Sequence, residues 1–200
     1  MNDEAELNLK KTLWKLAYAS RAVSHVLTTC DFYLKYIRDD RHPMFIPLMC
    51  SICVTYVRPF TDNGGVGMIS RKFARYSDPK LQRTHDLLWE SRKRFYAHQD
   101  ATATKIALSG KKSPLQEVRV AVIRTRTPNS NVLDFGLIYP EIRLRGIVIP
   151  DIRELCVELA RRLHLETNAT LTKLFSSNGP ELIRLLDEAK SDHIEISIGL

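Results

Sequence analysis

Residues 78–100 read DPKLQRTHDLLWESRKRFYAHQD, and this stretch predicts one amphipathic helix whose last turns are cationic and aromatic. Asp78 is a typical N-cap residue, and Pro79 suits the first helical position because its missing N–H has no partner there. The residues that indicate the helix recur at helical spacing: Leu81, His85, Leu88, Trp89, Arg92 and Phe95. His85 is expected to be a partly buried structural residue, turned away from His98.

The end of this stretch combines the side chains that cleavage of an RNA phosphodiester needs. His98 can move a proton near neutral pH, and the guanidinium groups of Arg92 and Arg94 match phosphate oxygens. A base would take the proton of the 2′-hydroxyl while the cations stabilise the charge that develops at the phosphorus, without a metal. Arg94 precedes His98 by four residues and shares its face, whereas Arg92 points about a third of a turn away.

Residues 92–98, RKRFYAH, resemble the arginine, four to six residues, histidine signature of the HEPN superfamily. Ala97-His98 followed by Asp100 resembles the abortive-infection-like branch, and YVRPF at 56–60 resembles what that branch carries before its motif helix. The resemblance covers roughly the first half of the chain. It implies a helical bundle that acts as a homodimeric, metal-independent endoribonuclease with its motif in a shared cleft, and it places the catalytic pair at Arg92 and His98.

Because a cleft between two subunits accepts either arginine, we keep Arg94 as a third catalytic candidate. Lys93, Tyr96, Arg58 and Asp100 are the candidates for binding RNA phosphate or for positioning the catalytic groups. A toxin or phage-defence effector, with an antitoxin or other protein partner, is implied by the resemblance alone.

Two other interpretations remain open. In the first, the motif is a charged helix end in which His98 caps carbonyl groups, in a catalytically inactive HEPN-like module that binds a protein partner or nucleic acid. The glycines of Asp62–Gly67 suggest a nucleotide site less strongly, because the Lys-Ser/Thr ending of a phosphate-binding loop is absent.

The positive charge is concentrated around the motif. The chain has 30 Lys and Arg against 23 Asp and Glu, a formal charge of +7. Between Ser70 and His98 there are eight cations and three acids, which gives 8 − 3 = +5 in this segment alone. Such a surface would attract RNA and make binding weaken with salt.

The cysteines and the N-terminus indicate a reducing, cytoplasmic environment. All four cysteines lie in apolar stretches, and Cys50 and Cys53 have no second ligand pair, so we expect neither a metal site nor a cofactor. Residues 1–6 are acidic, unlike a signal peptide, and the apolar run 44–57 is too short to cross a membrane.

The whole pattern predicts a single α+β domain over residues 1–200, mainly α: a HEPN-like helical bundle with a small antiparallel β-sheet in the second half. Residues 7–108 form the helical part, with helices at Leu7–Ile37 and Phe45–Val57 before the motif helix. Residues 117–149 alternate as a three-stranded meander, with runs at 117–124, 132–139 and 142–149. Residues 151–198 supply helices, the first opened by an Asp151 and Glu154 capping box, and a possible edge strand.

Overall fold

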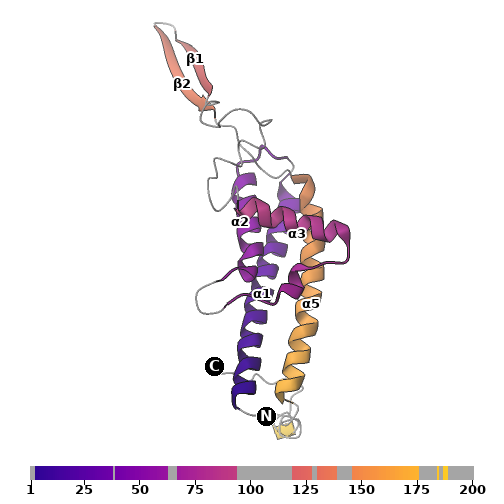
Figure 1. Cartoon of the computed structure of the whole chain (residues 1–200). Coiled ribbons are helices and arrows are strands. Elements are labelled where there is room, and N and C mark those ends of the chain that lie inside the picture. Colours follow the sequence, from indigo (N-terminus) through magenta and orange to yellow (C-terminus); the bar gives the residue numbers. More distant parts are fainter. Residues whose placement is uncertain are drawn as a thin grey trace.

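Two long antiparallel helices form the axis of the molecule (Figure 1). The computed structural model describes residues 3–37, 39–62, 67–93, 119–127, 130–138 and 146–175, together with residues 184, 187 and 188. Helix α1 (Asp3–Tyr36) and helix α5 (Ile149–Phe175) run side by side and make the most extensive helix–helix contact. Helix α2 (Phe45–Val57) packs on α1, and helix α3 (Pro79–Ser91) packs on α5 and α2.

Helix α1 can be long because residues 3–36 contain neither glycine nor proline. Its apolar positions recur so that one face is buried, and Leu16, Val23, Val26 and Cys30 are all at most 2% exposed. The expected helix at Leu7–Ile37 is therefore confirmed, with its start four residues earlier at Asp3.

Helix α2 has the predicted bounds and is almost entirely enclosed. Met49, Ile52, Cys53 and Tyr56 are all 0% exposed. Pro47 lies in the first turn, where its missing N–H costs no intrahelical hydrogen bond. The chain then continues directly into the 3₁₀ turn η1 (Arg58–Phe60).

The segment between η1 and α3 is hydrogen-bonded to η1 and to helix α5. The Ile69 N–H donates a hydrogen bond to the Pro59 carbonyl over 3.0 Å, which joins the residues before α3 to the turn η1. The 3₁₀ turn η2 (Arg71–Ala74) follows, with Ser70 as its N-cap. Arg162 of α5 donates to the carbonyl oxygens of Lys72 and Arg75 and so fastens this segment to α5.

The predicted α+β class, with a small antiparallel sheet in the second half, is wrong: the bundle fits, the sheet does not. Strands β1 (Arg119–Thr127) and β2 (Ser130–Ile138) pair only with each other, as a hairpin that extends from one end of the helices (Figure 1). The expected third strand is absent from residues 146–149, which form the turn η5 (Gly146–Val148) and the start of α5. Among the described residues, no third strand joins this hairpin to form the predicted meander.

The alternation of buried and exposed side chains at residues 146–149 arises because a helix starts there. Ile147 is 82% exposed whereas Ile149 is fully buried, which mimics a strand over so short a run. Ile149 is instead the first residue of α5 and lies three before Ile152, which is also buried. The predicted capping box is also wrong, because Asp151 lies inside the first turn of α5 rather than before it.

Several expectations lie outside the described residues. These are the extension of the motif helix over 94–108, the turn at 109–114, the start of the first predicted strand, most of the last helix at 181–190, and the edge strand at 193–198. In the part of the chain that the structure describes, no helix is long and apolar enough to cross a membrane.

Candidate functional site

The start of α3 is fixed in the way the sequence predicts. The Asp78 carboxylate accepts a hydrogen bond from the Lys80 backbone N–H over 2.7 Å, and Pro79 is the first helical residue. The Lys80 ammonium group reaches Asp151 at 2.9 Å and Glu154 at 2.7 Å, both in the first turns of α5. The acids predicted as a capping box therefore anchor the motif helix instead.

The end of α3 places the first candidate residues of the motif. Arg92 is the C-cap residue, its backbone N–H donates to the carbonyls of Leu88 and Trp89, and its side chain is half-buried. Lys93 follows with an exposed side chain. Arg94, Tyr96, His98 and Asp100 lie outside the described residues, so the structure leaves the relation of His98 to the two arginines as a prediction.

Arg58 lies on the turn that adjoins the last turns of α3. Its side chain is exposed, and its guanidinium carbon lies 5.3 Å from the ring centroid of Tyr18 on α1. Two residues later, the ring of Phe60 contacts that of Trp89 at 6.4 Å between centroids. The Phe60 and Trp89 contact thus brings the Arg58 turn close to the helix end that carries Arg92.

His85 belongs to a buried polar and aromatic cluster that the sequence did not reveal as a unit. It is 5% exposed, and its Nδ1 lies 2.7 Å from the Tyr56 hydroxyl, which lies 3.5 Å from the Tyr76 hydroxyl. The rings of Tyr56, Phe60, Tyr76 and Trp89 lie 5.2–6.2 Å from the His85 ring centroid. The predicted burial of His85 is therefore confirmed, and it is more complete than the partial burial expected.

Burial sets the protonation states in this cluster. Loss of solvation lowers the pKa of His85 below its ordinary value, against a smaller opposing effect of Asp86. Burial also raises the pKa of Tyr76 to about 12 and that of Tyr56 well above its ordinary value. The imidazole is therefore neutral and both phenols keep their protons near pH 7, which suits a structural hydrogen-bonded core rather than proton transfer.

The basic segment before the motif is partly neutralised by α5. Lys72 pairs with Glu166 at 2.7 Å, and Lys80 pairs with two acids as described above. The exposed cations Arg71, Arg75 and Arg83 remain on the surface of this segment. The local excess of positive charge is thus smaller in the folded chain than the count along the sequence suggests.

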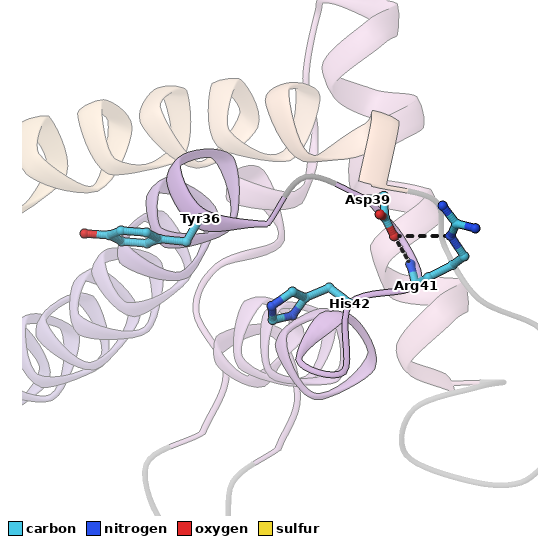
Figure 2. A pocket seen from close by; sticks show the side chains of 4 residues that line it. All are labelled: Tyr36, Asp39, Arg41 and His42. Atoms are coloured by element: carbon cyan, nitrogen blue, oxygen red, sulfur yellow. Dashed lines mark hydrogen bonds and ion pairs between the residues drawn. The ribbon is translucent and has the colours of Figure 1, made fainter.

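A hollow lies where α1 is followed by α2, far along the chain from the motif. It has a volume of about 310 Å³ and is lined by Tyr36, Asp39, Arg41 and His42 (Figure 2). The Asp39 carboxylate accepts from the Arg41 backbone N–H at 2.7 Å and lies 3.6 Å from the Arg41 guanidinium group. His42 uses Nδ1 to accept the Met44 N–H over 3.1 Å, so these groups stabilise the turn itself.

A second hollow of about 380 Å³ lies between α1, the segment after Gly67, and α5. Lys15, Lys72 and Glu166 line it, and the pairing of Lys72 with Glu166 leaves one net positive charge. Gly67 has a φ of +71°, and a Cβ there would come within 3.1 Å of the Lys15 Nζ. Glycine therefore satisfies both the left-handed backbone and the space that the lysine occupies.

The cysteines are free thiols. Cys30, Cys53 and Cys156 are buried, and burial raises the pKa of Cys30 to about 12. Such thiols hold their protons and pack as small apolar side chains. Among the described residues, no group of three or more His, Cys, Asp or Glu side chains is arranged to hold a metal ion.

Comparison of the chain with protein-family models, with curated proteins and with solved structures gave no match. The class of protein is therefore defined here by the arrangement of the helices and of the candidate site residues. It is a helical bundle built on two long antiparallel helices, α1 and α5. The cationic and aromatic end of α3, with Arg92, lies beside the turn that carries Arg58.

Proposed function

We propose that this chain is a metal-independent, HEPN-like endoribonuclease that cleaves RNA through the 2′-hydroxyl. The observation that carries the proposal is the sequence RKRFYAHQD at 92–100, which follows directly from an ordered, capped helix ending at Ser91. Its first cation, Arg92, occupies the C-cap, and Arg58 lies on the adjoining turn. A helix end fixed by Trp89 and Phe60 supplies a rigid base for such a motif.

In the proposed mechanism, His98 takes the proton of the 2′-hydroxyl or gives one to the leaving oxygen. Arg92 and Arg94 bind the scissile phosphate and stabilise the charge that develops on it. Lys93 and Arg58 contact the RNA backbone, and Tyr96 and Asp100 position the reacting groups. A second subunit completes the cleft, and a role as a toxin or phage-defence effector with a protein antitoxin is the biological setting that fits this chemistry.

The test is cleavage of a mixed-sequence RNA in the presence of EDTA. We expect the wild-type chain to give products with 2′,3′-cyclic phosphate ends, and His98→Ala to be slower by about 10²-fold or more, since general acid–base catalysis contributes at least this much. His164→Ala is the matched control, because His164 is an exposed histidine on α5 whose Nε2 bonds only locally, to Asn168 at 3.0 Å. Equal cleavage by the wild-type and His98→Ala proteins would remove His98 from the mechanism.

The same assay separates the two arginines. If Arg92 is the catalytic cation, Arg92→Ala loses most activity while Arg94→Ala loses little, and the reverse holds if the same-face geometry decides. Loss in both variants would indicate that both guanidinium groups contribute to cleavage.

The pairing of Lys72 and Lys80 with acids of α5 favours one other candidate, a catalytically inactive module that binds a protein partner. Under this interpretation the chain shows neither EDTA-resistant cleavage nor salt-dependent binding of RNA. Measurement of RNA affinity at two salt concentrations distinguishes the candidates, because phosphate contacts weaken steeply as salt rises.

A further inference from the structure

We propose that the hollow between α1, the segment after Gly67, and α5 binds a small organic carboxylate with an apolar body. The hollow, which we call the Lys15 hollow, is the one lined by Lys15, Lys72 and Glu166. Its volume of about 380 Å³ lies within the range of small-molecule sites. Three separate parts of the chain form its walls, so the site exists only in the folded molecule.

Lys15 brings a positive charge to the hollow without an acid to balance it. Its side chain is half-buried, and its Nζ would lie 3.1 Å from a Cβ at Gly67, so the ammonium group lies close to the glycine backbone. Residues 7–30 of α1 contain neither Asp nor Glu, and residues 67–76 on the facing segment also contain none. A half-buried ammonium group in such surroundings favours an anionic ligand, which would replace part of its lost solvation.

The charges from α5 set the charge of the ligand. Among the described residues, Glu166 is the one acid that lines the hollow, and it pairs with Lys72 at 2.7 Å. The two lysines and this glutamate leave one net positive charge, carried by Lys15. A carboxylate matches this charge, whereas a phosphate monoester carries close to two negative charges near pH 7 and exceeds it.

A hydroxyl group at the hollow can complete the binding of a carboxylate. The Ser70 Oγ accepts the Lys72 backbone N–H over 3.4 Å, which leaves the Ser70 hydroxyl hydrogen able to donate. Thr12 also lines the hollow, but its hydroxyl already donates to the Asn8 carbonyl over 2.9 Å. Lys15 and Ser70 are therefore the expected donors to the carboxylate, and the hydrogen bond from the ammonium group is charge-assisted.

The remaining lining of the hollow is apolar and requires an apolar body on the ligand. Leu16, Ile69 and Phe73 are 2%, 6% and 3% exposed and belong to the core, whereas Met68 is 45% exposed. A ligand that covers the Met68 side chain would remove apolar surface from water, and the flexible thioether can adapt to its shape. An alkyl chain and an aromatic ring both satisfy this requirement, so fatty acids and aryl carboxylates share the required chemistry.

Titration of the full chain, labelled with ¹³C at its methionine methyl groups, tests the site directly. We expect the Met68 resonance to shift and saturate with octanoate or with phenylpropionate, with a dissociation constant below about 1 mM. The tighter of the two acids identifies the alkyl or the aryl body. Met44 is the matched control, because it is 46% exposed but lies outside the hollow. Octanol, which lacks the charge, and inorganic phosphate, which lacks the apolar body, should bind about tenfold more weakly or less.

Variants of the lining residues test the proposed contacts. Lys15→Met keeps the stem but removes the charge, so the affinity for the tighter acid should fall about tenfold or more, whereas Lys15→Arg should retain binding. Lys11→Met is the matched control and should bind as the wild type does, since Lys11 is exposed on the same helix outside the hollow. Met68→Glu places an acid near Lys15 and should abolish binding, as measured by isothermal titration calorimetry.

Three results would overturn the proposal. They are the absence of a saturable Met68 shift with either acid up to about 10 mM, equal affinities of the wild type and Lys15→Met, and shifts of Met44 and Met68 that rise together without saturation. The last result indicates non-specific association of the acid with the surface. None of these measurements uses RNA, so the carboxylate site and the proposed nuclease can each fail without the other.

Discussion

At the scale of single residues, two histidines on the same stretch of sequence have different proposed roles. His98 carries the proposed chemistry, whereas His85 is enclosed by four aromatic rings and bonded to Tyr56. A neutral imidazole that accepts or donates one hydrogen bond fits such an enclosure, but an imidazolium group would lose its solvation there. The stability of the fold should therefore depend on the protonation of His85.

We predict that the free energy of unfolding falls as the pH is lowered from about 7.5 to about 5.5. The unfolded chain takes up a proton at His85 near pH 6.5, whereas burial lowers the pKa of the native residue, so the unfolded state binds more protons in this window. Each unit of pKa difference contributes about 1.4 kcal/mol. Urea unfolding of His85→Gln should show a flatter dependence on pH, while the exposed His164→Gln control keeps the wild-type slope. An unchanged slope in His85→Gln would show that other groups cause it.

At the scale of secondary-structure elements, one arginine holds an irregular segment on a helix. The Arg162 guanidinium group lies 5.0 Å from the ring centroid of Tyr76 and 5.6 Å from that of Phe73. It also donates to two backbone carbonyls of residues 72–75. A planar group with several donors can stack and bond at once, which a lysine cannot do. The segment that leads into the motif helix is thereby fixed to α5.

We predict that Arg162→Met lowers the free energy of unfolding by about 1–2 kcal/mol, since it removes charge-assisted hydrogen bonds but keeps the apolar stem. Amide hydrogen exchange should increase in residues 71–76 before it increases in α1. Arg161→Met is the matched control, because Arg161 pairs only with Glu158 on the same helix and is exposed. If both variants behave alike, the contacts of Arg162 with the segment do not contribute to stability.

At the scale of the whole molecule, residues more than a hundred positions apart close the end of the bundle. The Gly146 N–H donates to the Asp40 carboxylate over 3.0 Å, and the same carboxylate oxygen lies 3.2 Å from the Tyr33 hydroxyl, which donates to it. A methyl group on Gly146 would lie 1.8 Å from the Tyr33 oxygen. Glycine is required here for a close approach of chain segments rather than for an unusual backbone angle.

We predict that Gly146→Ala lowers the free energy of unfolding by about 1–3 kcal/mol, because Tyr33 and the start of α5 must move apart to admit the methyl group. Thermal denaturation followed by circular dichroism measures the effect. The neighbouring variant Ile147→Ala should be nearly neutral, since Ile147 is 82% exposed. A stable Gly146→Ala protein would show that this end of the bundle adjusts without strain.

Local sequence patterns were sufficient to predict the helices but not to predict which elements pack against them. The bounds of α2, the cap at Asp78 and the burial of His85 all follow from residues that lie near one another in sequence. The prediction of a sheet was wrong because it needed information from distant residues. A short alternation such as Ile147 to Ile149 is compatible with a strand or with the start of a helix. Which one forms depends on α1, against which α5 buries its apolar face.

The sequence alone determined where α2 and α3 begin and which faces of α1, α2 and α3 are apolar, because capping and helical periodicity act within a few turns. It also predicted the Arg92 to His98 motif as the candidate site, of which the structure describes Arg92 and Lys93. Only the tertiary structure decided that the acids of α5 neutralise Lys72 and Lys80, that Tyr56 and Tyr76 enclose His85, and that Arg58 lies over Tyr18. These contacts join residues from distant parts of the chain, so they exist only once burial of the apolar faces has brought the helices together.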